Sequence, residues 1–528
     1  MKKFIAVLLG VLMLFSLAAM TACKKESGET LNEAGYYEGN LEIRIVKAGY
    51  GVQWLYDIVD AYEKEYPGAT AHITETSDRD SIAARVRSSA NDSDIVVSVD
   101  SMFNNQADGY FYDLSNVFDS VQDGYDKPLR ERMNQSIRKY FETEDGKIYQ
   151  MPWQTGYQGF LYNKTVLDDL FGEKGYTLPR TTTELNELCA RVWSESNRQV
   201  YPVSMTTQES YLQNVFHGLW YQYSGERRDY YFQGYYPQQN EDGTVTYVAS
   251  KTKEDLDKTF SDPGREKALE ALYSLCVSVE LGGYAHDESN YMTFQEAQKA
   301  FIGYGYGSNP KKCAFMVNGD WFYKEMEDEC IEKNADIRFM KMPILSAVTE
   351  TLETENVSEE TLRSVVDAVD ANEPWSASLG VSENDYRRIS TLRYTALVTG
   401  DDHVIVVPRL NKNGTRFNLV EQFLKFLVSD EAQALFVMDQ RGLNMPYGFN
   451  TDGFSFNTFT DSVKEVTGDN YNMITYNDKY PFIYAGGISD VGYAESMFFK
   501  KEETAKQLLD RFKTRNLNRA DTFLKLVV

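Results

Sequence analysis

The stretch Asp94-Ile95-Val96-Val97-Ser98-Val99-Asp100 decides the fold of this chain. It is a short, almost wholly apolar run between two carboxylates. Runs of this kind are typical of a strand that is buried on both faces of a parallel sheet. The side chains of residues 41–46 alternate between apolar and polar, which predicts an earlier strand of the same sheet.

The segments between these two strands predict two helices and one further strand. Apolar side chains recur at helical spacing over residues 54–66, until Pro67-Gly68 ends the helix. A strand is expected around residues 71–75, and a helix over residues 82–86 follows it. The resulting order βαβαβ predicts an α/β protein with an open sheet.

The start of the chain has the layout of a secretory signal: two lysines, an apolar run over residues 4–20, and small residues before Cys23. This segment resembles the bacterial lipobox. The resemblance implies that the signal peptide, residues 1–22, is removed and that lipidated Cys23 anchors the protein on the outer face of the cell membrane, extracellular or periplasmic. A membrane-spanning anchor is the alternative, but the apolar run is short for a spanning helix. Residues 23–40 are polar and predict a flexible tether.

Length, charge and motifs restrict the class of protein. A chain of 528 residues is too long for one ordinary core, so two large lobes are expected. The formal net charge of −25 argues against a nucleic-acid partner, because such proteins carry a basic surface. No GxxxxGK[ST], HExxH or GxSxG motif occurs, and the four histidines lack metal-ligand spacing. We therefore predict no metal and no cofactor.

The cysteines that follow Cys23 are scattered along the chain and form no CxxC pair. They are Cys189, Cys276, Cys313 and Cys330. This pattern predicts buried thiols, and a single disulfide bridge stays open as an alternative.

Seven segments carry, in order, a resemblance to a known family. They are the strand that ends in Asp100, then residues 150–153 (QMPW), 160–164 (FLYNK), 178–185 (LPRTTTEL), 300–301 with 314–321 (AF, then AFMVNGDW), 404–408 (VIVVP) and 418–440. Together they resemble the extracellular solute-binding proteins of family 1, the receptors that pass sugars to ABC importers. The chain departs from the family at residues 91–93, where Asn-Asp-Ser replaces a common glycine, and in two stretches that look like insertions, 225–261 and 344–392.

The resemblance implies a two-lobed periplasmic-binding-protein fold of the type II kind. Each lobe is then an open, mostly parallel sheet flanked by helices, and a hinge joins the lobes. The implied bounds are 41–153 and 393–444 for lobe one, 154–343 and 445–528 for lobe two, and 344–392 for the insertion. The implied protein is a monomer and not an enzyme, and its partners are a carbohydrate and the transmembrane subunits of an ABC permease.

The candidate ligand residues follow from the chemistry of a sugar and from strand ends. Ligands of open α/β sheets bind beyond the carboxyl ends of the strands, where residues 49–54 and Asp100 lie. A sugar offers hydroxyls and a patch of C–H groups, so its site needs aromatic faces beside polar groups. We predict that Trp54, Asp100, Trp153, Gln154, Trp220, Asp320, Trp321 and Tyr447 bind the ligand. The alternatives are a core position for Trp54 and a helix-capping role for Asp100.

Two other functions stay open at this stage. An exported glycosidase needs two carboxylates at the scissile bond, and 79 acidic residues allow many such pairs. A polyamine or peptide receptor would use the same fold, because an acidic cleft attracts cations. Stacked tryptophans beside neutral amides favour a sugar, whereas converging carboxylates favour an amine.

Overall fold

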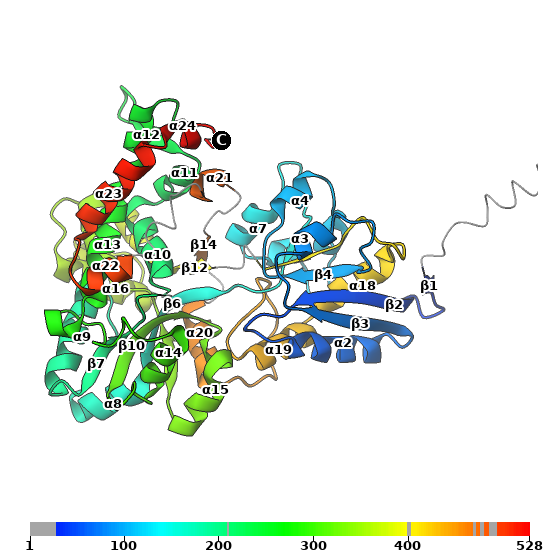
Figure 1. Ribbon diagram of the computed structural model, residues 1–528, viewed down its shortest axis with the longest axis horizontal. Coiled ribbons are helices and arrows are strands. Elements are labelled where there is room, and N and C mark those ends of the chain that lie inside the picture. Colours follow the sequence, from blue (N-terminus) through cyan, green and yellow to red (C-terminus); the bar gives the residue numbers. More distant parts are fainter. Residues whose placement is uncertain are drawn as a thin grey trace, which may run out of the picture.

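The computed structural model describes residues 28–208, 211–398, 403–467, 471–475, 480–484 and 494–527. The predicted signal peptide and Cys23 lie outside the described residues. The described chain forms two lobes side by side, each built on a six-stranded sheet (Figure 1). Within this part of the chain, no helix combines the length and the apolar character needed to cross a membrane.

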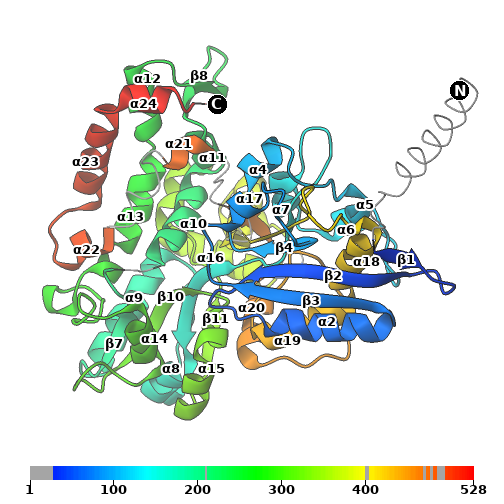
Figure 2. The ribbon, with the colours of Figure 1, turned by 45° about the vertical axis from the view of Figure 1, so that its right-hand side comes forward.

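Lobe one has a sheet with the strand order β1-β2-β4-β13-β5, and β3 pairs with β2. Figures 1 and 2 show α2 and α19 on one side of this sheet and α3 and α4 on the other. Its strands are β1 (Glu29–Leu31), β2 (Tyr37–Val46), β3 (Ala69–Thr76), β4 (Ile95–Ser98), β5 (Met151–Pro152) and β13 (Val404–Val406). Its helices are α2 (Gln53–Glu65), α3 (Ile82–Arg85), α4 (Phe103–Ala107), α5 (Ser115–Phe118), α6 (Leu129–Arg132), α7 (Gln135–Phe141), α18 (Phe417–Leu427) and α19 (Asp430–Gln440).

Lobe two has a sheet with the strand order β14-β12-β6-β10-β7, and β11 pairs with β6. Its strands are β6 (Tyr157–Asn163), β7 (Val200–Ser204), β10 (Lys312–Gly319), β11 (Ile337–Met340), β12 (Thr395–Val398) and β14 (Asn472–Ile474). Its helices are α8 (Lys164–Phe171), α9 (Thr182–Glu195), α10 (Leu212–Ser224), α11 (Arg227–Phe232), α12 (Lys253–Phe260), α13 (Pro263–Cys276), α14 (Phe294–Ile302), α15 (Phe322–Lys333), α20 (Thr458–Thr467), α21 (Pro481–Tyr484), α22 (Ala494–Phe499), α23 (Ala505–Leu517) and α24 (Ala520–Leu524).

The two insertion-like stretches add small units to lobe two. A hairpin of β8 (Tyr235–Gln239) and β9 (Val245–Ala249) turns at Asn240–Thr244. Helices α16 (Glu359–Asp370) and α17 (Glu383–Arg393) enclose a small apolar core of their own. Short 3₁₀ turns occur at Gly172–Lys174, Val279–Leu281, Ser346–Thr351 and Ala377–Leu379.

The local predictions for lobe one are confirmed, and their causes are visible. Helix α2 places the apolar side chains of its periodic run, Trp54 and Ile58 among them, in the core. Within residues 418–440, α18 is followed by α19, and the side chain of Ser429 accepts a hydrogen bond from the backbone N–H of Ala432. This N-cap separates α18 from α19.

The strand directions correct the prediction of mostly parallel sheets. Among the described strands, β2 pairs in parallel with β3 and β4, and so do β7 with β10 and β12 with β14. The remaining pairs of both six-stranded sheets are antiparallel. The reason is that β5, β6, β12 and β13 belong to segments that pass between the lobes, and these segments run in opposite directions.

Three predicted bounds also change. Part of the expected tether is ordered, because β1 pairs with the start of β2 at residues 29–31 and 37–39. Strand β12 belongs to the sheet of lobe two, so residues 395–398 are not part of lobe one. Residues 445–448 run along lobe one instead of lobe two, since Tyr447 forms a β-bridge with Met133.

Candidate functional site

Two segments that pass between the lobes run antiparallel beside each other. In lobe two, β6 and β12 pair Gln158 with Leu397. In lobe one, β5 and β13 pair Met151 with Ile405. The short stretch 153–156 between β5 and β6 therefore joins the two sheets, and Figure 1 shows β6 extending from one lobe toward the other. A joint of this kind is suited to hinge motion, because few residues connect the lobes.

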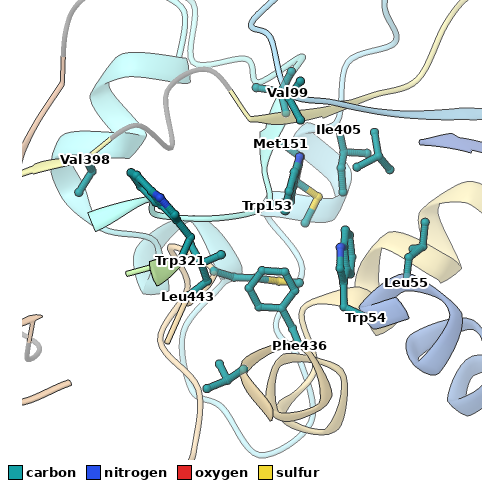
Figure 3. Close-up of a cluster of buried hydrophobic side chains, with 14 of the residues drawn as sticks. Trp54, Leu55, Val99, Met151, Trp153, Trp321, Val398, Ile405, Phe436 and Leu443 are labelled. Atoms are coloured by element: carbon teal, nitrogen blue, oxygen red, sulfur yellow. The ribbon is translucent and has the colours of Figure 1, made fainter. Parts of the chain in front are cut away.

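A cluster of aromatic rings lies where this joint meets lobe one. The rings of Trp54 and Trp153 stack with their centroids 5.2 Å apart and their planes 19° apart. Phe436 from α19 packs edge-on against Trp54, and Figure 3 shows these three rings side by side. The indole N–H of Trp153 donates a hydrogen bond of 2.9 Å to the carbonyl oxygen of Ser98. Ring stacking and the hydrogen bond of the indole N–H together fix the orientation of Trp153.

Tyr50 connects this cluster to lobe two. Its ring centroid lies 5.8 Å from that of Trp153 and 6.5 Å from that of Trp321, edge-on to both. Trp321 in turn meets the ring of Tyr211 at 5.3 Å. Gly319 allows this arrangement, because a Cβ there would stand 2.2 Å from the Trp321 ring. The aromatic side chains of both lobes thus come together at the ends of β2 and β10.

Two hollows adjoin the joint. The first, about 480 Å³, lies at the end of β4 and is lined by Asp100, Ser101 and Arg79. Asp100 forms a two-pronged ion pair with Arg79 and is half exposed. The helix-capping alternative for Asp100 is wrong, because α4 begins after Met102 and no side chain caps it.

The second hollow, which we call the junction cavity, has a volume of about 500 Å³. Its lining comes from Arg132 and Asn134 of lobe one, from Lys464 and Met473 of lobe two, and from residues 444–451 that pass between the lobes. Tyr447 lines it as well, and its hydroxyl donates a hydrogen bond of 2.9 Å to the carbonyl oxygen of Pro152. A solute in this cavity would touch both lobes.

Known proteins share this architecture. Residues 57–275 match the model of a family described as bacterial extracellular solute-binding protein. The chain has the fold of these proteins. Three similar solved structures are apo RafE from Streptococcus pneumoniae (13% identity, TM-score 0.59, 93% of this chain and 98% of that one), the bacterial solute receptor AcbH (13%, 0.58, 92% and 100%), and a Bacillus licheniformis sugar transporter in complex with stachyose (15%, 0.52, 90% and 98%). No curated protein sequence matches the chain.

The predictions of fold and of a non-enzymatic class agree with these comparisons. The family description and the structure titles name binding proteins, a receptor and a sugar transporter rather than enzymes.

All five aromatic residues among the predicted ligand residues are buried in apolar cores. Trp153 (2% exposed), Tyr447 (3%) and Trp321 (5%) lie near the joint, and the other two are Trp54 and Trp220. Trp54 is fully buried, so its alternative core position is the correct one. Trp220 is 1% exposed, packs against Phe216 and Tyr231, and donates its indole N–H to Asp262. The predicted stacking wall at Trp220 is therefore wrong. Sequence spacing alone does not distinguish an inward-facing tryptophan from one at a cleft.

Gln154 and Asp320 lie at the joint and differ in their bonding. Both are fully buried. Neither polar atom of the Gln154 side chain has a hydrogen-bond partner among the described residues. Asp320 accepts hydrogen bonds from the backbone N–H of Tyr157 at 2.9 Å and from the hydroxyl of Thr155 at 3.4 Å. Burial raises the pKa of Asp320 to about 8. Its hydrogen bonds hold the stretch between β5 and β6 against the end of β10.

The structure adds residues that the sequence prediction lacks. Tyr50 stands in a loop that was expected at a strand end, but its ring was not singled out. Tyr211 lies just before α10 and meets Trp321, and its only sequence signal is its place after strand β7. Arg132 and Lys464 line the junction cavity from different lobes, far apart in the sequence. Only the fold brings such residues together.

Proposed function

We propose that this chain is a lipid-anchored receptor that captures a carbohydrate, and specifically an oligosaccharide, between its lobes. It delivers the sugar to the transmembrane subunits of an ABC importer. The observation that carries the proposal is the lining of the junction cavity. Its described residues include amides such as Asn444 and Asn450, hydroxyls such as Thr451, and the ring of Tyr447, but no Asp or Glu. Such a lining suits sugar hydroxyls and C–H faces and does not suit an amine.

The neighbours support the choice of ligand class. AcbH is described as having an exclusive preference for β-D-galactopyranose, and other structures hold raffinose in RafE and stachyose in the Bacillus licheniformis protein. A ligand that touches both lobes favours their closed arrangement by its difference in affinity for the two states. The closed form is then the signal that a permease recognises, and Cys23 keeps the receptor beside it.

The direct test is a thermal-shift and calorimetric screen of residues 24–528 against mono- and oligosaccharides, polyamines and short peptides. A ligand at a hundred times its Kd adds about 2.7 kcal/mol to the free energy of unfolding. We expect an oligosaccharide to raise the Tm and to be recovered intact by chromatography. Recovery of a cleaved sugar, or a shift with amines alone, would overturn the proposal.

Two variants identify the part of the joint that holds the sugar. Trp321→Ala removes an aromatic face at the end of β10, and Asn444→Ala removes an amide from the junction cavity. Their matched controls lie on the distant insertion: Trp375→Ala, whose indole N–H donates to Val381, and the exposed Asn384→Ala. We expect at least one site variant to weaken binding about tenfold or more, as the loss of one buried contact does, and both controls to bind normally.

A further inference from the structure

The described lining of the junction cavity has a charge opposite to that of the whole chain. The sequence carries 79 acidic and 54 basic residues. Among the described residues, the lining nevertheless has two cationic side chains, Arg132 and Lys464, and no carboxylate. The two cations come from different lobes. A neutral ligand requires no such arrangement.

Lys464 has no anionic partner within the described part of the chain. Its ammonium makes neither a hydrogen bond nor an ion pair there, and it stands 3.4 Å from the ring centroid of Phe456 and 5.8 Å from that of Phe449. Burial lowers the pKa of Lys464, and the carboxylate of Asp461, one turn earlier on α20, opposes this shift. The aromatic faces position the ammonium and leave its three N–H donors available.

Arg132 lines the cavity from lobe one and is held by several contacts. Its guanidinium carbon lies 3.3 Å from the ring centroid of Tyr125, and its Nε donates to the carbonyl oxygen of Gly448 at 3.1 Å. Nη1 donates to the side chain of Gln122, so the group is held in one orientation. The hydroxyl of Tyr125 contacts Asp430, which balances part of the charge of Arg132. Among the described residues, Lys464 is therefore the cation of the lining that no carboxylate contacts directly, although Asp461 lies one turn away.

We infer that the ligand of the junction cavity is an acidic oligosaccharide, whose carboxylate pairs with the ammonium of Lys464. This inference rests on the proposed function and narrows its substrate class. The neutral amides and hydroxyls of the lining accommodate the sugar hydroxyls, while Lys464 from lobe two and Arg132 from lobe one face the acid group. Pairing inside a partly buried cavity is screened little by salt. The ligand would then connect the lobes by charge as well as by hydrogen bonds.

The test compares matched neutral and acidic saccharides by calorimetry on residues 24–528. The pairs are galactose with galacturonate, glucose with glucuronate, and the corresponding disaccharides with digalacturonate and cellobiouronate. We expect an acidic member to bind about 10- to 100-fold more tightly than its neutral counterpart, because a charge-assisted hydrogen bond contributes a difference of that size. Lys464→Met should remove this difference.

The matched control is Lys333→Met, because Lys333 also holds its ammonium over a ring, 4.0 Å from the centroid of Tyr304, but lies outside the cavity lining. Both variants should keep the wild-type Tm without ligand. Equal binding of neutral and acidic members, or binding of neutral members alone, would overturn the acidic ligand and leave the carbohydrate receptor intact. Binding of no saccharide in either set would overturn the proposed function itself.

Discussion

The carboxylate of Asp320 accepts a hydrogen bond of 2.9 Å from the backbone N–H of Tyr157, and the N–H of Asp320 donates back to the carbonyl oxygen of Tyr157 at 2.9 Å. Asp320 follows the last residue of β10, and Tyr157 is the first residue of β6. This reciprocal pair fixes the start of lobe two to the stretch that enters it from lobe one. The carboxyl group of Asp320 is fully buried, so the protonation state of Asp320 affects the joint directly.

Asp320→Asn should reduce the pH dependence of stability. The pKa of Asp320 rises from 3.8 to about 8 on folding because the carboxyl is buried. The folded state therefore binds more protons than the unfolded state between these values, and stability falls as the pH rises through the window. Between about pH 5 and about pH 9, urea denaturation should show the wild type losing roughly 2 to 5 kcal/mol relative to Asp320→Asn.

The control for this experiment is Asp452→Asn, at an exposed residue in the segment after Asn450. Its stability should follow the wild type across the pH range. If the free energy of unfolding depends on pH in the same way for the wild type and Asp320→Asn, then Asp320 is ionised in the folded protein and burial does not raise its pKa.

The local structure of lobe one could be predicted because it depends on near neighbours in the sequence. The spacing of apolar side chains defines α2, and the Ser429 N-cap defines where α19 begins. The strand directions could not be predicted, because they depend on segments such as β13 that return from the other lobe. The junction cavity could not be predicted either, because Arg132 and Lys464 line the same cavity only once both lobes have formed.

Trp220→Ala should destabilise lobe two strongly. Trp220 is 1% exposed within the core of that lobe, and its indole N–H is bonded to Asp262. The loss of a buried tryptophan typically costs about 3 to 5 kcal/mol. Chemical denaturation measures this, with Trp375→Ala as the partly exposed control, for which a change of about 1 kcal/mol or less is expected. A small effect of Trp220→Ala would argue that the ring faces a solvent-filled space.

The four cysteines that follow Cys23 should be unreactive in the native state. Cys189, Cys276, Cys313 and Cys330 are all free and buried. Burial raises the pKa of Cys313 and of Cys330 to about 12, so few thiolates exist at neutral pH. A thiol reagent such as DTNB should label these positions only after denaturation, and a reducing agent should leave the Tm unchanged. Fewer than four thiols after denaturation would reveal a disulfide.

Asp100→Asn tests whether the exposed strand-end carboxylate contacts the ligand. Its ion pair with Arg79 is half exposed, so its loss should change stability by about 1 kcal/mol or less. If Asp100 accepts hydrogen bonds from sugar hydroxyls, the affinity should fall about tenfold, as the loss of a hydrogen bond to a charged group does. Arg79→Gln is the matched control, because it breaks the same ion pair and keeps the carboxylate. Equal affinity losses in both variants would assign the effect to the pair instead of to Asp100.

Cys23→Ser should release the protein from the membrane without changing the structure of the two lobes. The small residues before Cys23 resemble a lipobox, and two or more acyl chains are needed for stable anchoring. In a bacterial host fed an alkyne fatty acid, the wild type should take up the label and sediment with membranes, whereas Cys23→Ser should not be labelled. Purified residues 24–528 should bind the same saccharides with unchanged Kd, because the described lobes begin after the anchor. Labelling of Cys23→Ser would place the lipid on another residue and remove the basis for the anchor proposed here.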